Sequence, residues 1–214
     1  MEKAKLELLE RKHYSQTILP DKLKEKIFPV VLKVFSSNDF HQVTMRQIIE
    51  LSGVSGSTLY KYFFTKEDLL FFTLEEKIAN IHHNIVIHVA GLKSGKEILR
   101  KILWATMDYY DNNPEVAVTA FITVPMGTWM KQESFPGVPL KKIFVRILAE
   151  LKEQKLIDNI IDLRLFQDLY YMICYRYIYT WYYFGMKWKL VDAVYKDFDV
   201  LWKLFRSEAE TMVG

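Results

Sequence analysis

The sequence predicts an all-α protein with a small N-terminal helical domain and a larger helical C-terminal domain. Gly and Pro are scarce, at 8 and 6 among 214 residues, which disfavours disorder and turn-rich β architectures. Half of the residues are hydrophobic, and in long stretches they recur every three or four positions, the period of an amphipathic helix. A chain of this length can hold such a pair of domains.

Composition and charge exclude several classes of protein. The net charge of +3 comes from 29 Lys+Arg and 26 Asp+Glu, so bulk electrostatics do not indicate a polyanionic partner. Cys174 is the single cysteine, which excludes an internal disulfide and a multi-cysteine metal site. Residues 1–20 contain charged residues such as Glu7, so they form no uninterrupted apolar run. Arg176 likewise places a charge within the Tyr-rich apolar segment 169–188. We therefore expect no secretory signal, no membrane span and a cytoplasmic protein.

Residues 43–70 contain three helix-start signals in close succession. In each, an apolar residue precedes a hydroxyl-bearing cap, a polar residue follows three positions after the cap, and an apolar residue comes next. This order is a capping box with a hydrophobic staple, and it occurs at Thr44, Ser55 and Thr65. Gly53 stands where a helix must end in a left-handed residue. The segment predicts a helix, a three-residue turn and a second helix, at residues 44–51, 52–54 and 55–63.

This order of elements is that of the helix-turn-helix unit, whose second helix enters the major groove of DNA. Such short helices are marginal alone and must be held by packing. We expect a helix within residues 21–40, which contains Pro29, to cover them. The side chains predicted to face this core are Ile48, Leu51, Val54, Leu59 and Phe63.

Residues 40–70 resemble the DNA-binding region of the tetracycline-repressor-like family of bacterial transcriptional regulators. Phe40 is followed by "VTMRQII", "SGVS" and "STLYKYFFTKEDL", in the order of that family's pattern. The resemblance covers roughly residues 21–81. Two positions depart from the pattern: Ile49 stands where the family usually has alanine, and Ser57 where glycine is frequent. Neither departure removes a cap or the turn.

The resemblance implies a domain order and a function. An N-terminal extension, a helix-turn-helix DNA-binding domain with its motif at 44–63, and an effector-binding and dimerisation domain would occupy residues 1–20, 21–81 and 82–214. The protein would be a ligand-responsive transcriptional regulator, a repressor released from its operator by a small apolar or aromatic effector. As a homodimer it would present two recognition helices to palindromic half-sites in double-stranded DNA. No cofactor is implied.

The motif indicates which residues contact DNA. Hydroxyl groups and helix N-termini bind phosphates as readily as lysines do. Lys66 opposes the dipole at the start of its helix, which a phosphate partner would explain. Tyr60 and Tyr62 cannot both point the same way, so one of them is expected to pack inward. The expected phosphate contacts are Thr44, Thr58, Tyr60, Tyr62 and Lys66, the small residues that allow close approach are Ser55, Gly56 and Ser57, and the cations within reach of bases are Arg46 and Lys61.

Helical periodicity continues through the rest of the chain. The predicted helices span 66–89, 94–110, a segment from Pro114, 138–154, 162–184 and 190–206. The stretch 127–139 breaks the pattern and is interpreted as a gate.

The last two predicted helices suggest a dimer interface. The helix at 162–184 is apolar on nearly every side and must be covered all round, which a second copy would do. The predicted interface residues are Tyr177, Trp181, Val194, Phe198, Leu201, Trp202 and Phe205.

An effector pocket follows from the resemblance, and its lining is chosen from aromatic and Met residues, which suit apolar ligands. The same residues taken singly are more typical of core. The candidates are Trp104, Met107, Phe121, Met126, Trp129, Met130, Phe144, Tyr175 and Tyr179.

Other functions find less support. The chain has no G-x-S-x-G, no phosphate-binding glycine loop and no H-E-x-x-H, so we do not expect an enzyme. His82, His83 and His88 lack the spacing of four that places two metal ligands on one helix face. A helical module that binds a protein or lipid without binding DNA remains the alternative.

Overall fold

The computed structural model describes residues 19–129 and 138–205, with the side chains of 138–143 left out. Its elements are all helical over these ranges. They are α2 (Asp21–Ser37), α3 (Met45–Ser52), α4 (Gly56–Tyr60), α5 (Lys66–Val89), α6 (Gly95–Asn112), α7 (Pro114–Val118), the π-helix η1 (Thr119–Thr123), α8 (Met126–Trp129), α9 (Val138–Glu153), α10 (Leu163–Tyr183) and α11 (Leu190–Trp202).

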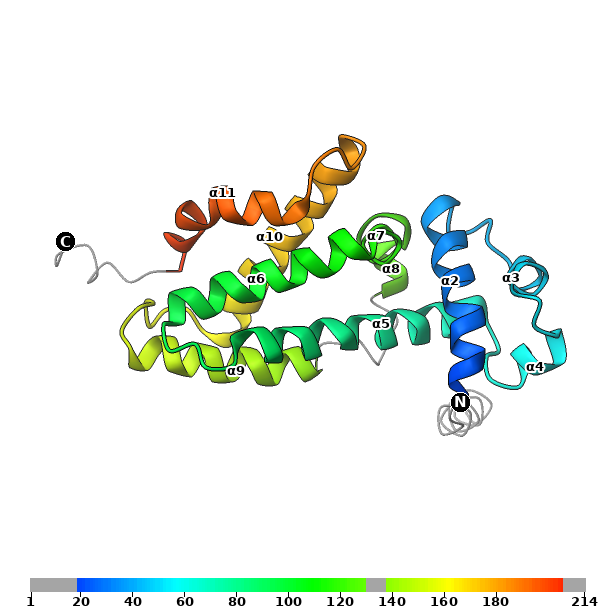
Figure 1. The fold of residues 1–214 in the computed structure, drawn as a ribbon, viewed down its shortest axis with the longest axis horizontal. Coiled ribbons are helices and arrows are strands. Elements are labelled where there is room, and N and C mark those ends of the chain that lie inside the picture. The colour runs from blue at the N-terminus through cyan, green and yellow to red at the C-terminus, as the bar shows by residue number, and fades with distance from the viewer. Residues whose placement is uncertain (1–18, 130–137, 206–214) are drawn as a thin grey trace.

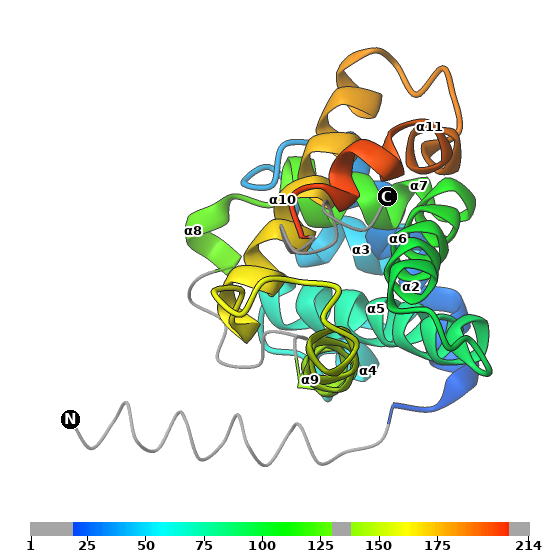
Figure 2. The ribbon, with the colours of Figure 1, turned by 90° about the vertical axis from the view of Figure 1, so that its left-hand side faces the viewer.

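The helices form an elongated molecule with a small head at one end (Figure 1). Helices α2, α3 and α4 make the head, and α5 runs from the head along the body, where it packs against α6. Helix α11 lies on another side of α6, and α9 packs against α5, α6 and α10. Seen end-on, α11 and α9 lie at opposite sides of the body (Figure 2). The α5 helix is therefore the one element that belongs to both the head and the body.

The three predicted helix starts are confirmed. Thr44 accepts a hydrogen bond from the Gln47 N–H at 3.2 Å, and Ser55 accepts one from the Thr58 N–H at 3.2 Å. Of the three starts, only Thr65 closes the complete box, because the Asp68 carboxylate also accepts from the Thr65 N–H at 3.1 Å. Each cap satisfies an N–H group that the helix itself leaves without a partner.

The turn between α3 and α4 is also as predicted. Gly53 adopts φ 65°, and its N–H bonds to the Ile49 carbonyl at 3.2 Å. A residue with a Cβ would be strained in this left-handed conformation. Helix α4 ends at Tyr60, earlier than the predicted 63.

The head core contains Ile48, Val54, Leu59 and Phe63, which pack with α2. Leu51 does not join them, since it is 61% exposed, and its predicted inward position was wrong. Helix α3 ends one residue later, and Ile48 and Val54 already close the core beside it. An exposed leucine thus lies directly before the turn.

Helix α11 packs on α6, and its N-terminus is held from there. The Asp111 carboxylate accepts hydrogen bonds from the Leu190 N–H at 2.7 Å and the Val191 N–H at 3.1 Å. Lys189, at the N-cap position, provides no side-chain bond. A distant carboxylate therefore does the work of a local cap.

The predicted dimer-interface residues lie mostly inside the chain, which corrects that prediction. Trp181, Val194, Phe198, Trp202 and Phe205 are buried within one copy. Tyr177 is half-buried and donates to the Ala193 carbonyl at 3.4 Å, and Leu201 packs against the core. The apolar stripe of α11 faces α6, so the exposed apolar surface lies elsewhere.

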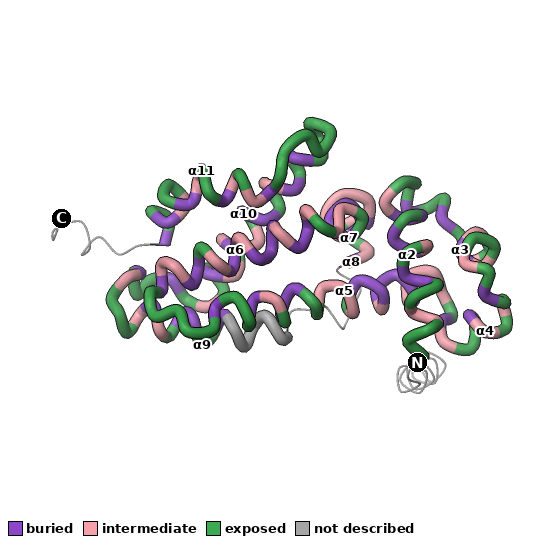
Figure 3. Tube along the Cα trace, viewed as in Figure 1, coloured by how far each residue is buried: buried purple, intermediate pink, exposed green. Residues whose placement is uncertain are grey.

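One such surface is the outer side of α10 and the turn that follows it, where Figure 3 shows exposed residues. Its exposed apolar side chains on α10 are Leu165, Met172, Tyr175, Tyr179, Tyr182 and Tyr183. The rings of Tyr175, Tyr179 and Tyr183 stack in sequence, with centroids 6.0 and 6.5 Å apart. We call Leu165, Met172, Tyr175, Tyr179 and Tyr183 the α10 row. None of the described helices has the length and hydropathy to cross a bilayer.

Candidate nucleic-acid interface and ligand cavity

The start of α4 presents a cluster of hydroxyl groups to solvent. Ser55 Oγ lies 3.1 Å from Ser57 Oγ and 2.8 Å from Thr58 Oγ1. Ser55 and Ser57 are exposed, and Thr58 is half-exposed. A methyl group added to Gly56 would make only ordinary contacts, at 3.5 Å to Ile49 and 4.0 Å to Tyr60. The fold itself therefore does not require glycine at position 56.

The two tyrosines of this motif point different ways, as expected. Tyr60 is 48% exposed, whereas Tyr62 packs partly against the head core. The Lys61 Nζ lies 5.7 Å from the centroid of the Tyr62 ring. Arg46 is exposed and forms an ion pair with Glu50 at 2.8 Å. Thr44 is exposed beside the start of α3.

Lys66 has a different role from the predicted phosphate contact. Its Nζ donates to the carbonyls of Phe40 at 2.6 Å, Val43 at 2.8 Å and His41 at 3.3 Å. It also lies 4.8 Å from the centre of the Phe40 ring. An ammonium group has three donors, and here all three have acceptors within the chain. These hydrogen bonds to the turn between α2 and α3 explain why a lysine stands at the start of α5, where its charge opposes the helix dipole.

A cavity of about 550 Å³ lies in the body. Helices α5, α6, α8 and α10, together with η1 and the residues after it, form its walls. Four of the predicted ligand residues line it: Phe121, Met126, Trp129 and Tyr175. Its volume is that of a pocket for a small organic ligand.

The other predicted ligand residues lie elsewhere. Met107 and Phe144 are fully buried in the core, and Trp104 packs against His88 and Lys101. Tyr179 belongs to the exposed α10 row. Met130 falls outside the described residues. Aromatic type alone could not separate these side chains from the lining.

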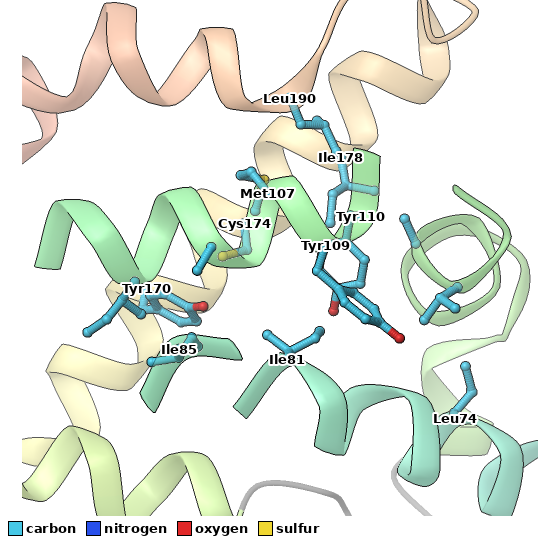
Figure 4. Close-up of a cluster of buried hydrophobic side chains, with 14 of the residues drawn as sticks. Leu74, Ile81, Ile85, Met107, Tyr109, Tyr110, Tyr170, Cys174, Ile178 and Leu190 are labelled. Carbon is cyan, nitrogen blue, oxygen red and sulfur yellow. The ribbon is translucent and has the colours of Figure 1, made fainter. Parts of the chain in front are cut away.

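The sequence analysis missed several residues that line the cavity. The main ones are His82, Thr106, Tyr110, Tyr170, Tyr171 and Cys174. His82 lies four positions after Ile78, which also lines the cavity, so the two share one face of α5. Figure 4 shows Tyr110, Tyr170 and Cys174 in the body core with Ile81, where α5, α6 and α10 meet.

The polar groups of the cavity wall are neutral. Tyr170 and Thr106 share a hydrogen bond at 2.5 Å between their hydroxyl oxygens. Burial lowers the pKa of His82, which favours the uncharged imidazole. Burial raises the pKa of the Cys174 thiol to about 12, and that of the Tyr110 hydroxyl well above its ordinary value. The His82 Nδ1 is buried and has no hydrogen-bond partner among the described residues.

One segment connects the cavity to the head. Ala120, Phe121 and Ile122 of η1 line the cavity, and η1 packs against both α2 and α10. Helix α7, which precedes it, also packs against α2. Figure 1 shows α7 beside α2. The cavity wall is thus in direct contact with the head through η1.

Comparison with known proteins supports this description. Residues 31–71, which contain the C-terminal part of α2, all of α3 and α4 and the start of α5, match the family model for bacterial regulatory proteins of the tetR family. The head is therefore similar to the DNA-binding part of that family. Among curated proteins, HbdR of Aromatoleum sp., an HTH-type transcriptional regulator, is 28% identical over 103 residues, 48% of this chain and 45% of HbdR. NicS of Pseudomonas putida, an HTH-type transcriptional repressor, is 28% identical over 104 residues, 49% and 47% of the two chains. The match spans less than half the length of these relatives.

The fold of most of the chain is similar to that of solved bacterial regulators. The fatty acid degradation regulator FadR from Bacillus halodurans superposes with a TM-score of 0.77 at 18% identity, covering 87% of this chain and 97% of that one. FadR from Bacillus subtilis, solved in complex with stearoyl-CoA, gives 0.73 at 20% identity, covering 83% and 96%. At these identities the likeness concerns the fold.

Proposed function

We propose that the protein is a homodimeric, ligand-responsive transcriptional regulator, a cytoplasmic repressor released from its operator when a small apolar or aromatic effector fills the cavity. The observation that carries the proposal is the exposed hydroxyl cluster at the start of α4, placed after the left-handed turn at Gly53. The match of residues 31–71 to the tetR family model supports it. It is a regulator and has no catalytic role.

The exposed groups of α3 and α4 suggest how DNA is bound. Thr44, Thr58 and Tyr60 are placed to bind phosphates and set the register. Long side chains that could read bases are few in this motif, Arg46 and Lys61, and Arg46 is already paired with Glu50. Base contacts from the small residues at the start of α4, together with DNA shape, then carry more of the specificity.

Dimerisation uses the α10 row in this proposal. The row gathers exposed apolar side chains on one face of α10, and such a surface normally marks an interface. A second copy with the same row would cover it by an isologous contact. Two α4 helices would then meet half-sites about 34 Å apart on one side of the duplex.

Effector release follows from the connection between cavity and head. An effector that fits only one arrangement of α5 and η1 favours the matching position of α2. Coupling of this kind is typically ~1–3 kcal/mol, enough to change operator occupancy several-fold or more. The names of the relatives support a repressor and a ligand-binding C-terminal part, since NicS is a repressor and the FadR of Bacillus subtilis was solved with stearoyl-CoA.

The proposal is tested by selecting bound fragments from the source genome and titrating a selected duplex by fluorescence anisotropy. We expect nanomolar to micromolar affinity that falls steeply as salt rises, because bound phosphates release counterions. A helical module that binds protein or lipid would show no duplex preference and little salt-dependent binding. That result would reject the regulator.

Gly56→Ala sharpens this test. The change leaves the fold intact or slightly more stable, because the added methyl meets only ordinary contacts and alanine favours helix. If the α4 backbone approaches the duplex, the methyl lowers operator affinity by about tenfold. Gly127→Ala is the matched control, since nothing lies within 4 Å of its added methyl and it is on α8, away from α3 and α4. Equal operator affinity for both variants would remove the start of α4 from the interface.

A further inference from the structure

We infer that the cavity binds an uncharged effector and excludes organic acids and ammonium compounds of the same carbon skeleton. The inference rests on the proposed function and defines the chemical class of its ligand. Its basis is the juxtaposition of an apolar aromatic wall with hydrogen-bonding groups that carry no charge.

The wall contains no Asp, Glu, Lys or Arg among the residues that are described there. Its members are aliphatic, aromatic or neutral polar side chains, from Ile78 and Ile81 on α5 to Met172 and Tyr175 on α10. Histidine is the only lining residue type that could carry a charge near neutral pH, and burial disfavours the charged form of His82. A ligand inside the cavity therefore meets dipoles and rings rather than counter-ions.

The charged residues that adjoin lining residues in the sequence do not themselves line the cavity. Arg176, next to the lining Tyr175, is exposed. Asp111, next to the lining Tyr110, binds the N-terminus of α11 at 2.7 and 3.1 Å. Lys77, next to the lining Ile78, is half-exposed and does not line the cavity. A ligand carboxylate or ammonium that moved from water into the cavity would find no partner of opposite charge among the described lining residues. Burial of an unpaired charge is strongly unfavourable.

A neutral polar group, by contrast, finds partners in the cavity. The hydroxyl pair of Thr106 and Tyr170, joined at 2.5 Å, has unused acceptor capacity. Burial lowers the pKa of His82 and so favours its uncharged imidazole, which can donate at one nitrogen and accept at the other. An ester or thioester carbonyl, a ketone or an alcohol can bond to groups of this kind without bringing a charge. The remaining surface suits a ring system or a hydrocarbon chain.

The test uses probes that share a skeleton and differ in charge. Methyl 4-phenylbenzoate, 4-phenylbenzoate and 4-phenylbenzyltrimethylammonium are titrated into the full chain by isothermal calorimetry at pH 7.5. Methyl dodecanoate and dodecanoate, below their aggregation limits, repeat the comparison with a chain-shaped skeleton. We expect the esters to bind roughly tenfold or more tightly than the acids and the ammonium compound.

A pair of variants at Ile78 tests the cause of the preference. Ile78 lines the cavity and is only half-buried, so Ile78→Lys places a cation at the wall where its charge can remain solvated. We expect Ile78→Lys to bind 4-phenylbenzoate about tenfold more tightly than the wild-type chain does, because the carboxylate gains a partner. Ile78→Met, of similar length and no charge, keeps the preference for the ester. Thermal melts of both variants verify that they fold.

The outcomes separate this inference from the proposed function. Acids that bind as tightly as the esters, or an ammonium probe that binds more tightly through the aromatic rings, overturn the inference while operator binding stands. Absence of binding by every probe overturns the inference as well. Failure to bind any selected duplex, with ester binding intact, overturns the proposed regulator and leaves a cavity for uncharged ligands.

Discussion

The position of Lys66 in the motif predicts one partner, and the structure shows another. At the start of α5 its charge opposes the helix dipole, which favours an external anion as its partner. The structure instead gives it the carbonyls of Phe40, His41 and Val43. These residues form the turn between α2 and α3, so Lys66 joins the recognition motif to the helix that leads to the body.

Lys66→Ala should therefore act on stability. Hydrogen bonds to a charged group contribute roughly 1.5–3 kcal/mol, so we expect the free energy of unfolding to fall by about 2 kcal/mol. Urea denaturation followed by circular dichroism measures this. Lys61→Ala, an exposed lysine nearby, should change the free energy of unfolding by less than about 0.5 kcal/mol. An unchanged urea midpoint for Lys66→Ala, with a salt slope of operator binding reduced by about one unit, would restore the phosphate contact.

At the scale of helices, local signals were sufficient for most of the architecture. Caps at Thr44, Ser55 and Thr65 act within three residues, and the sequence contains all that they need. The predicted span of α5, from 66 to 89, is the one observed. The π-helix at Thr119–Thr123 was not foreseen, because its residues continue an ordinary helical pattern after Pro114.

Contacts between distant helices explain what the sequence could not reveal. Asp111 caps α11 from a position 79 residues away, and Lys66 reaches a carbonyl 26 residues away. The lining of the cavity has the same origin, since His82 of α5 and Tyr170 of α10 face one cavity only in the folded body. Residue type identified aromatic candidates, but packing decided that Phe121 lines the cavity and Phe144 fills the core.

Asp111→Ala provides a test at this scale. It leaves two N–H groups at the start of α11 without their acceptors, and loss of a cap costs about 1 kcal/mol. Asp111→Asn should cost less, because one carbonyl oxygen remains and burial already raises the pKa of the carboxyl, disfavouring its charge. Urea midpoints measure both. Asp108→Ala, earlier on α6, is the control, and an equal loss there would show that the cap contributes nothing specific.

At the scale of the whole molecule, the α10 row is one of the apolar surfaces that the described residues leave exposed. The stripe of α11 was expected at the interface, but α6 already covers it. Helix α10 instead exposes stacked tyrosines that have no cover within the chain. The prediction of a dimer is kept, and the residues assigned to it change.

Tyr179→Lys should convert the dimer to a monomer. It places a charge in the middle of the α10 row, and two such charges would meet across an isologous contact. Analytical ultracentrifugation should give twice the 25.5 kDa chain mass for the wild-type protein and the single mass for the variant. Operator affinity should fall with it, because both half-sites are needed. Val86→Lys, on the exposed side of α5, should remain a dimer; if Tyr179→Lys does so too, the interface lies elsewhere.

The continuity of α5 has a mechanical consequence. Between Ile81 at the cavity and Lys66 at the head the helix rises about 22 Å, at about 1.5 Å per residue. A tilt of roughly 5° about the cavity end would displace the other end by about 2 Å over that arm. Since Lys66 fastens this end to the turn before α3, the displacement carries α3 and α4 along as a unit. A ligand that reorients a few rings in the body can thereby change the distance between two recognition helices by more than a hydrogen bond tolerates.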